Sequence, residues 1–395
     1  MKRAVLSLLF LLAAGMVTPG SPAVAQDAPQ VIQGPLRGYY TYGQLHSVTT
    51  EEAIRGAAVA TTIPMGVYTV TSSRDDNVYQ GVVVGRSPFF HGSRTTSIPT
   101  FIVPVKVKTS DGHAFDPSAA DSSCLSSKVP LTVFQNSPLF DSAAFTMNGV
   151  GVGTTQYSDA FERAEFWQKV SVTGNRFHTM LAPITTLAEQ TLTLSSGQGE
   201  DFSGVPCGNL AVINFSTLDS FVQNTIVPFV SGQGGGPTSF PIILLYNVVL
   251  ADPYVSGTTD NCCILGYHNA FLNPVQTYGV MDFDTTEAFN QPGSTTADIS
   301  VSSHEIDEWI NDPLGNNATP AWGHIGQVSG CQNNFEVGDP LSGTLFPSVT
   351  LNSFTYHPQE LAFFSWFYGA PSIGTGSSEF SNNDTFGSDA GPVCE

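Results

Sequence analysis

The chain has 395 residues, of which 33 are Asp or Glu and 13 are Lys or Arg, so its formal net charge is −20. Nucleic-acid binding relies on a basic face that neutralises phosphates, and this composition argues against that class of partner. No apolar run reaches the roughly 18 to 20 residues that a membrane-spanning helix needs. We therefore expect a folded, acidic protein with neither a nucleic-acid partner nor a membrane span.

The first 25 residues have the pattern of a secretory signal peptide. Lys2 and Arg3 precede an apolar stretch over residues 4–14, and Ala23-Val24-Ala25 offers small residues at a cleavage site. We predict that residues 1–25 are removed and that the mature chain is secreted, extracellular or periplasmic. Cleavage takes away two basic residues and no acid, so the net charge becomes −20 − 2 = −22.

All six cysteines follow the leader, and an even number in an exported chain indicates disulfide bonds. A four-cysteine zinc cluster would need C-x2-C pairs, and the sequence contains none. Adjacent residues of an extended chain point their side chains to opposite faces, so Cys262 and Cys263 are not expected to join each other. The pairing is otherwise left open among Cys124, Cys207, Cys262, Cys263, Cys331 and Cys394.

Residues 27–150 form a region that is predicted to be rich in β-strands. Short β-type runs separated by turn residues occur at residues 66–70, 81–84 and 101–107. A carbohydrate-binding surface in this region is one alternative for the function. The region could be a separate domain, a propeptide or part of one fold.

Residues 151–395 are predicted to form the domain that holds the chemistry. Apolar residues at helical spacing predict a helix over residues 156–170, and a Gly-rich spacer at 231–236 precedes strand candidates at 241–250 and 277–283. The aromatic run 363–368 is expected in the core rather than at a substrate wall. The acid pairs Glu162 and Glu165, and Asp282 and Asp284, could be glycosidase carboxylates, but we interpret them as a solvated helix face or a turn.

A second predicted helix begins at an N-cap, Asp298, and ends before Asp312-Pro313. On it, His304 and Glu308 are four residues apart, which lets an imidazole nitrogen and a carboxylate oxygen converge on one metal ion. Glu305 is rotated about 100° from His304, where a general base for a metal-bound water belongs. The H-E-x-x-E spacing therefore predicts a metal centre, against the alternative of a solvated acidic helix.

A third protein ligand must come from elsewhere in the chain, because catalytic zinc usually has three protein ligands and a water. The nearest acids downstream are Glu336 and Asp339; we favour Glu336 as the ligand and Asp339 as a carboxylate that orients His304. His268 and His324 are weaker candidates for a ligand or a transition-state donor. One imidazole with two carboxylates suits Zn²⁺, with Mn²⁺ or Ca²⁺ as alternatives.

Ser303-His304-Glu305-x-x-Glu308-x-x-x-Asp312-Pro313, followed by Trp322 and by Glu336-Val337-Gly338-Asp339, resembles exported zincin-like proteins with S-H-E-x-x-E-x-x-x-D-P and then E-[IV]-G-D. The plant EXORDIUM or phosphate-induced proteins look like distant relatives. The resemblance covers roughly residues 241–340. It implies an α+β fold in which a zincin-like, twisted mixed sheet lies over the metal-site helix, with His304, Glu308 and Glu336 as ligands and Glu305 as base. Zincin proteases mostly carry His where Glu308 stands.

These features predict a secreted metal-dependent peptidase that acts on a peptide or protein substrate through a metal-activated water. The alternative from another class is a non-catalytic exported or cell-envelope protein that retains the ion as a structural element. No G-x-S-x-G or Walker-type motif indicates another reaction.

Overall fold

A computed structural model of the chain describes residues 30–32, 36, 38, 50–58, 60–72, 74–91, 94–172, 174–271, 274–323, 331–369, 371–374 and 380–382. The predicted signal peptide lies outside these residues. Within them, no helix combines the length and the apolar character needed to cross a membrane.

The centre of the fold is a curled sheet of mixed strand direction, organised around one long strand, β4 (Thr95–Lys108). β4 runs parallel to β12 (Phe240–Tyr246) on one side and to β8 (His178–Thr186) and β9 (Gln190–Thr193) on the other. The sheet continues from β12 to β16 (Gln276–Phe283) and then to the antiparallel β15 (Gly266–Phe271), and a short antiparallel β5 (Ala114–Phe115) follows β4. A strand of the N-terminal region thus lies between strands of the C-terminal region.

A second sheet has the strand order β1 (Gln30–Val31), β10 (Gly199–Ser203), β11 (Leu210–Asn214), β13 (Val248–Ala251) and β14 (Cys262–Ile264). The sequence predicted one strand over residues 241–250, but the chain changes sheets between β12 and β13. Asn247 makes the break with φ of 55°, a left-handed conformation that Asn tolerates better than most residues.

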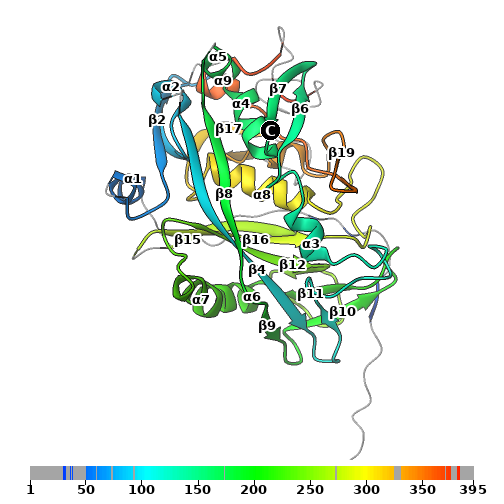
Figure 1. Cartoon of the computed structure of the whole chain (residues 1–395). Coiled ribbons are helices and arrows are strands. Elements are labelled where there is room, and N and C mark those ends of the chain that lie inside the picture. Colours follow the sequence, from blue (N-terminus) through cyan, green and yellow to red (C-terminus); the bar gives the residue numbers. More distant parts are fainter. Residues whose placement is uncertain are drawn as a thin grey trace, which may run out of the picture.

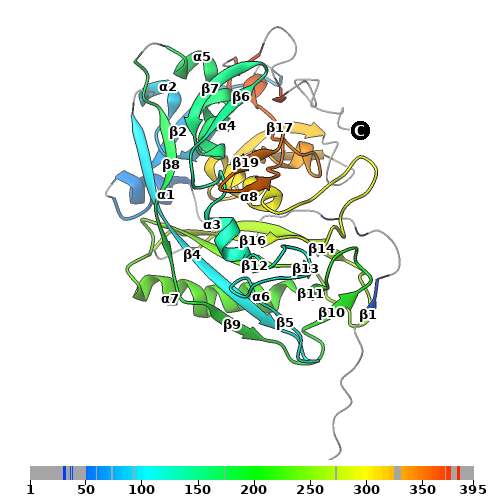
Figure 2. The same ribbon diagram turned by 45° about the vertical axis from the view of Figure 1, so that its right-hand side comes forward.

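The helix that carries the predicted metal site is α8 (Ser300–Asn311), which crosses one face of the central sheet (Figures 1 and 2). Trp309 of α8 stacks on Phe240 of β12 with ring centroids 3.6 Å apart. The helix α4 (Tyr157–Glu165) packs against α8 from the other side. The opposite face of the sheet carries α6 (Phe215–Phe221), a π-helical turn over residues 222–226 and α7 (Val227–Gly232).

Smaller elements complete the described part of the chain. Their bounds are α1 Thr50–Ala58, β2 Met65–Thr71, β3 Val78–Val84, α2 Pro88–His91, α3 Pro130–Gln135, β6 Ala143–Met147, β7 Val150–Thr155, α5 Trp167–Val170, β17 Ala318–Gly323, β18 Cys331–Asn334, the 3-10 turn Asp339–Leu341, β19 Val349–Leu351, β20 Phe354–Tyr356 and α9 Ser365–Tyr368.

Most predicted elements are confirmed, with adjusted ends. The strands expected at 66–70, 81–84, 101–107 and 277–283 lie in β2, β3, β4 and β16, and the helix expected at 156–170 is divided into α4 and α5. α8 ends as predicted, but its N-cap is Ile299; Asp298 instead accepts hydrogen bonds from the amides of Ile299 (2.6 Å) and His357 (2.9 Å). The observed fold is a mixed α/β arrangement around a curled mixed sheet.

Two expectations about polar surface are wrong. The pair 162/165 is buried, not solvated, because α4 packs on α8, and Asp282 lies in the buried strand β16 rather than in a turn, with the buried Asp284 just after it. The aromatic run 363–368 lies mostly in the core, as expected, and contributes four buried rings to the cluster around α4.

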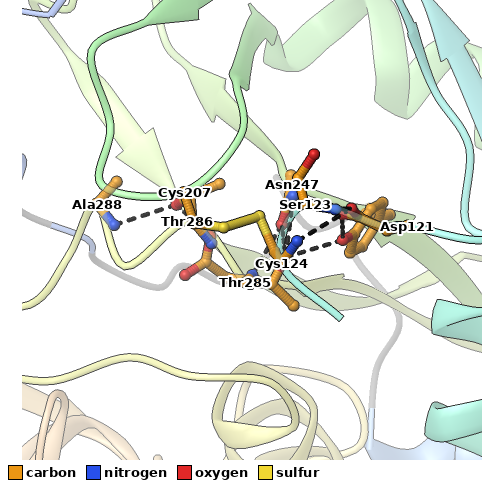
Figure 3. The surroundings of a disulfide bond; sticks show 10 residues. Asp121, Ser123, Cys124, Cys207, Asn247, Thr285, Thr286 and Ala288 are labelled. Atoms are coloured by element: carbon orange, nitrogen blue, oxygen red, sulfur yellow. Dashed lines mark hydrogen bonds between the residues drawn. A yellow bond between two sulfur atoms is a disulfide. The ribbon is translucent and has the colours of Figure 1, made fainter. Parts of the chain in front are cut away.

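A disulfide joins Cys124 to Cys207, and the amide of Cys207 donates to the carbonyl of Thr286 at 3.0 Å (Figure 3). The structure also joins Cys262 to Cys263, so the prediction that these neighbours stay apart is wrong. It assumed an extended chain, whereas the two Cα atoms are only 3.0 Å apart. Cys394 lies outside the described residues.

Candidate metal centre

Every residue of α8 is buried, which is unusual for a helix with four charged or titratable side chains in five consecutive positions. Its apolar face packs on β12, and its polar face is covered by α4 and by the segments around residues 336–339 and 357–361. The alternative of a solvated acidic helix is therefore wrong. Burial gives these polar groups a strong need for partners of opposite charge or for hydrogen bonds.

His304 is the centre of the site. Its Nε2 lies 3.0 Å from Oε2 of Glu308 and 3.7 Å from Oδ1 of Asp339. Its Nδ1 lies 2.9 Å from Nε2 and 3.2 Å from Oε1 of Gln359. Gln359 is itself fixed, since its Nε2 donates to the carbonyl of Gly338 and its amide donates to Oγ of Ser303, both at 2.8 Å. The imidazole therefore directs Nε2 at two carboxylates while Gln359 holds the other ring nitrogen.

The segment 336–339 closes over α8 through its backbone. Oε1 of Glu308 accepts from the amides of Gly338 (3.2 Å) and Asp339 (3.1 Å), which leaves Oε2 to face His304. Gly338 lies against the imidazole, and a Cβ at this position would be 2.4 Å from Nδ1 of His304. Only glycine allows this close approach.

Glu305 lies on the neighbouring side of the helix and faces His268 of β15. Oε2 of Glu305 is 3.3 Å from Nδ1 of His268, whose Nε2 lies 3.1 Å from the carbonyl of Asp312. A carbonyl only accepts, so Nε2 of a neutral His268 carries the proton and Nδ1 is an acceptor. A protonated Glu305 supplies the matching donor. A Cβ at Gly266 would be 2.9 Å from Oε1 of Glu305, so this glycine makes room for the carboxyl group.

The pKa values of these groups are shifted towards the neutral forms. Burial lowers the pKa of His304 to about 4 and that of His268 to about 3. Burial raises the pKa of Glu308 to about 8, against the lowering effect of the two amides that bond to it. For Glu305 and Glu336 burial, and then the neighbouring acid Glu308, raises the pKa well above its usual range. Without a cation, the cluster avoids accumulating negative charge only by holding protons.

The residues present fit a divalent ion. Two groups of three bring their ligand atoms within 4.8 Å of one another, namely His304, Glu308 and Asp339, and His268, Glu305 and Glu308. Among the described residues, no group donates a hydrogen bond to the buried Oε1 of Glu305 or Oε2 of Glu336. In the described part of the chain, no Lys or Arg forms an ion pair with Glu305, Glu308 or Glu336. Imidazole and carboxylate donors of this number suit Zn²⁺ or Mn²⁺.

The structure brings together nearly all of the predicted site residues. Glu336 is in the cluster, but its Oε2 lies 4.0 Å from His268, while Asp339 is the acid that approaches His304. His324 lies outside the described residues. Sequence reasoning did not find Gln359, because a lone glutamine 55 positions from the helix has no spacing that marks it.

The chain matches no protein-family model, no curated protein and no solved structure. The resemblance to zincin-like and EXORDIUM proteins therefore remains a hypothesis based on the motif residues.

Proposed function

We propose that the chain is an exported, metal-dependent hydrolase of peptide bonds whose site is built on α8. The observation that carries this proposal is the convergence of His304, Glu308 and Asp339 on one point, with Glu305 on the adjacent side of the same helical turn. The disulfide between Cys124 and Cys207 supports export, since such bonds persist in oxidising compartments.

His304, Glu308 and Asp339 would hold the ion, and Glu336 is close enough to Glu308 to influence its charge. A bound divalent ion would polarise a substrate carbonyl and lower the pKa of a water. Gln359 holds the imidazole of His304 in the orientation that directs Nε2 to the ligand side. The backbone amides on Glu308 keep one of its oxygens in place, so that its other oxygen faces His304.

Glu305 would act as the general base in its deprotonated form, which the positive charge of a bound ion would favour; its Oε1 is buried and its Oε2 faces His268. A proton taken from water by Glu305 can be returned to the leaving amine. His268 is neutral and is anchored to the carbonyl of Asp312, so its ring limits the positions that the carboxyl group of Glu305 can take. This assignment makes Glu305 a catalytic residue and His268 a positioning residue.

A second candidate function is a structural ion in a non-catalytic exported protein. The observation that favours it is burial: His304 and Glu305 are 0% exposed and Glu308 is 3% exposed, whereas a hydrolytic site must admit its substrate. The two functions predict different behaviour of one variant.

The test compares wild type with Glu305→Gln for bound zinc and for cleavage of a broad peptide library. The hydrolase proposal expects the variant to keep the ion and to lose at least 100-fold in cleavage rate. Retained zinc with no cleavage by wild type supports the structural ion. Loss of zinc from Glu305→Gln would instead assign Glu305 as a ligand, together with His268 and Glu308, and would overturn the base assignment.

A further inference from the structure

The turn between β4 and β5 presents two potential metal ligands. The amide of Thr109 bonds to the carbonyl of His113 at 3.0 Å, and Gly112 closes the turn with φ of 92°. Oδ1 of Asp111 accepts from the amide of His113 at 3.3 Å, which fixes the two side chains relative to each other. The side chain of His113 is half exposed and reaches β10.

Asp201 of β10 is the buried partner of this turn. Its side chain is 1% exposed, and its Oδ2 lies 2.8 Å from Nδ1 of His113 and 2.8 Å from the donating Nδ2 of Asn209. Among the described residues, no N–H or hydroxyl group donates to its buried Oδ1, and the carboxyl group of Asp111 is its neighbour. The ligand atoms of Asp111, His113 and Asp201 all lie within 4.8 Å of one another. Two carboxylates and an imidazole thus surround a buried oxygen to which no N–H or hydroxyl group of the described residues donates.

We propose that Asp111, His113 and Asp201 form a second divalent-cation site, separate from the one on α8, which fastens the β4–β5 turn to β10. A buried carboxylate oxygen with a second carboxylate beside it needs either a shared proton or a cation. One imidazole nitrogen and two carboxylates form a three-residue ligand set that suits Zn²⁺ or Mn²⁺. The exposed side of His113 leaves room for water to complete the coordination.

The pKa of Asp201 agrees with this arrangement. Burial, followed by the neighbouring side chain of Asp111, raises it to about 6. Above that pH the carboxyl is charged, and a cation relieves the repulsion between the two acids.

The location suggests what the ion does. Cys124 follows β5 and Cys207 follows β10, so the disulfide connects the same two stretches of chain that the proposed ion connects (Figures 2 and 3). β5 is only two residues long, and the end of β10 is covered on one side only by the two-residue edge strand β1. The proposed ion would link the β4–β5 turn to β10, and the disulfide would link the segments that follow β5 and β10.

The experiment uses the mature, metal-free chain and equilibrium dialysis against Zn²⁺. The variants His113→Asn and Asp111→Asn should each bind one equivalent of zinc fewer than wild type. This difference does not depend on how much zinc the site on α8 binds. His178→Asn is the matched control, because His178 also pairs with a buried acid, Asp159 at 2.7 Å, but belongs to none of the three metal-ligand groups found among the described residues. It should bind as much zinc as wild type.

Unchanged zinc stoichiometry in both turn variants overturns the proposal. If Asp111→Asn then alters only the pH at which the protein unfolds, the two carboxylates share a proton. Circular dichroism checks the fold of each variant. If either variant is unfolded, the site is tested on the wild-type protein by NMR instead. In that measurement Mn²⁺ should broaden the imidazole NMR signals of His113 and not those of His178; equal broadening or none also overturns the site.

Discussion

At the scale of single residues, Gly338 determines how closely the segment 336–339 can approach the imidazole of His304. Gly338→Ala would place a Cβ 2.4 Å from Nδ1 and push the two backbone donors away from Glu308. We expect a loss of about 2 kcal/mol in the free energy of unfolding, together with weaker zinc binding. Urea denaturation and zinc titration measure the two effects.

Gly232→Ala is the matched control, because no atom lies within 4 Å of the Cβ position there and the residue is exposed at the end of α7. Its stability should change by less than about 1 kcal/mol. Equal behaviour of the two alanine variants would mean that close packing of Gly338 on His304 does not support the site.

Gln359 holds the ring of His304 without touching the proposed ion. Gln359→Ala leaves Nδ1 of a buried imidazole without its partner and frees the ring to rotate. Removing such a supporting partner typically weakens metal binding by about 10- to 100-fold. Competition with a zinc chelator measures this change. Gln190→Ala is the control, because the side chain of Gln190 donates to the backbone carbonyls of residues 188 and 189. An affinity equal to wild type would remove Gln359 from the site.

At the scale of elements, α4 and α8 meet through polar side chains. Nδ2 of Asn311 donates to Oε1 of Glu162 at 2.6 Å, and Oγ of Ser158 donates to Oδ2 of Asp307 at 2.9 Å. Burial raises the pKa of Glu162 to about 8, against the lowering effect of the Asn311 hydrogen bond. The two helices therefore pack through a carboxyl group that is most stable when protonated.

This pKa predicts how stability depends on pH. In the unfolded chain Glu162 ionises near pH 4.5, and in the folded protein it ionises only near pH 8. The folded state holds the proton more tightly, so the contribution of Glu162 is complete below about pH 4.5 and is lost as the pH rises to about 8. Glu162→Gln keeps an acceptor for Asn311 and removes the ionisation.

We expect Glu162→Gln to be more stable than wild type by roughly 3 kcal/mol at pH 7, with no difference near pH 4.5. Urea denaturation at several pH values measures this difference. Glu189→Gln, whose acid pairs with Lys106 at the surface, is the control and should change stability by no more than about 1 kcal/mol. A pH-independent difference for Glu162→Gln would contradict the linkage.

The same interface shows how far sequence reasoning reaches. Local periodicity located α8, its end before Asp312 and the i, i+4 relation of His304 and Glu308, because those depend on residues close in the chain. It placed Glu162 on a solvated surface because α4 reads as amphipathic with a charged face. Only the tertiary packing of α4 on α8 shows that this charged face is buried. The contact of Gln359 with His304 also depends on tertiary packing, because the two residues are 55 positions apart in the chain.

At the scale of the whole molecule, the curled sheet joins strands from both predicted regions, over residues 95–283. β4 of the N-terminal region pairs with β12 and β8, so the strands beneath α8 and those leading to the β4–β5 turn belong to one sheet. The candidate site on α8 and the proposed site at the turn therefore lie on one framework. An ion at either position should raise the stability of the same cooperative structure.

Metal removal tests this at the level of the whole fold. In a His113→Asn background, so that only the site on α8 is counted, zinc at 1,000 times its Kd should stabilise the protein by about 4 kcal/mol. Calorimetry should then show a Tm higher by roughly 5 to 10 °C with zinc than after chelation. Adding Glu308→Gln removes the acid shared by both ligand groups on α8 and should abolish the difference. If zinc leaves the Tm of the His113→Asn variant with Glu308 intact unchanged, the cluster on α8 holds protons rather than an ion.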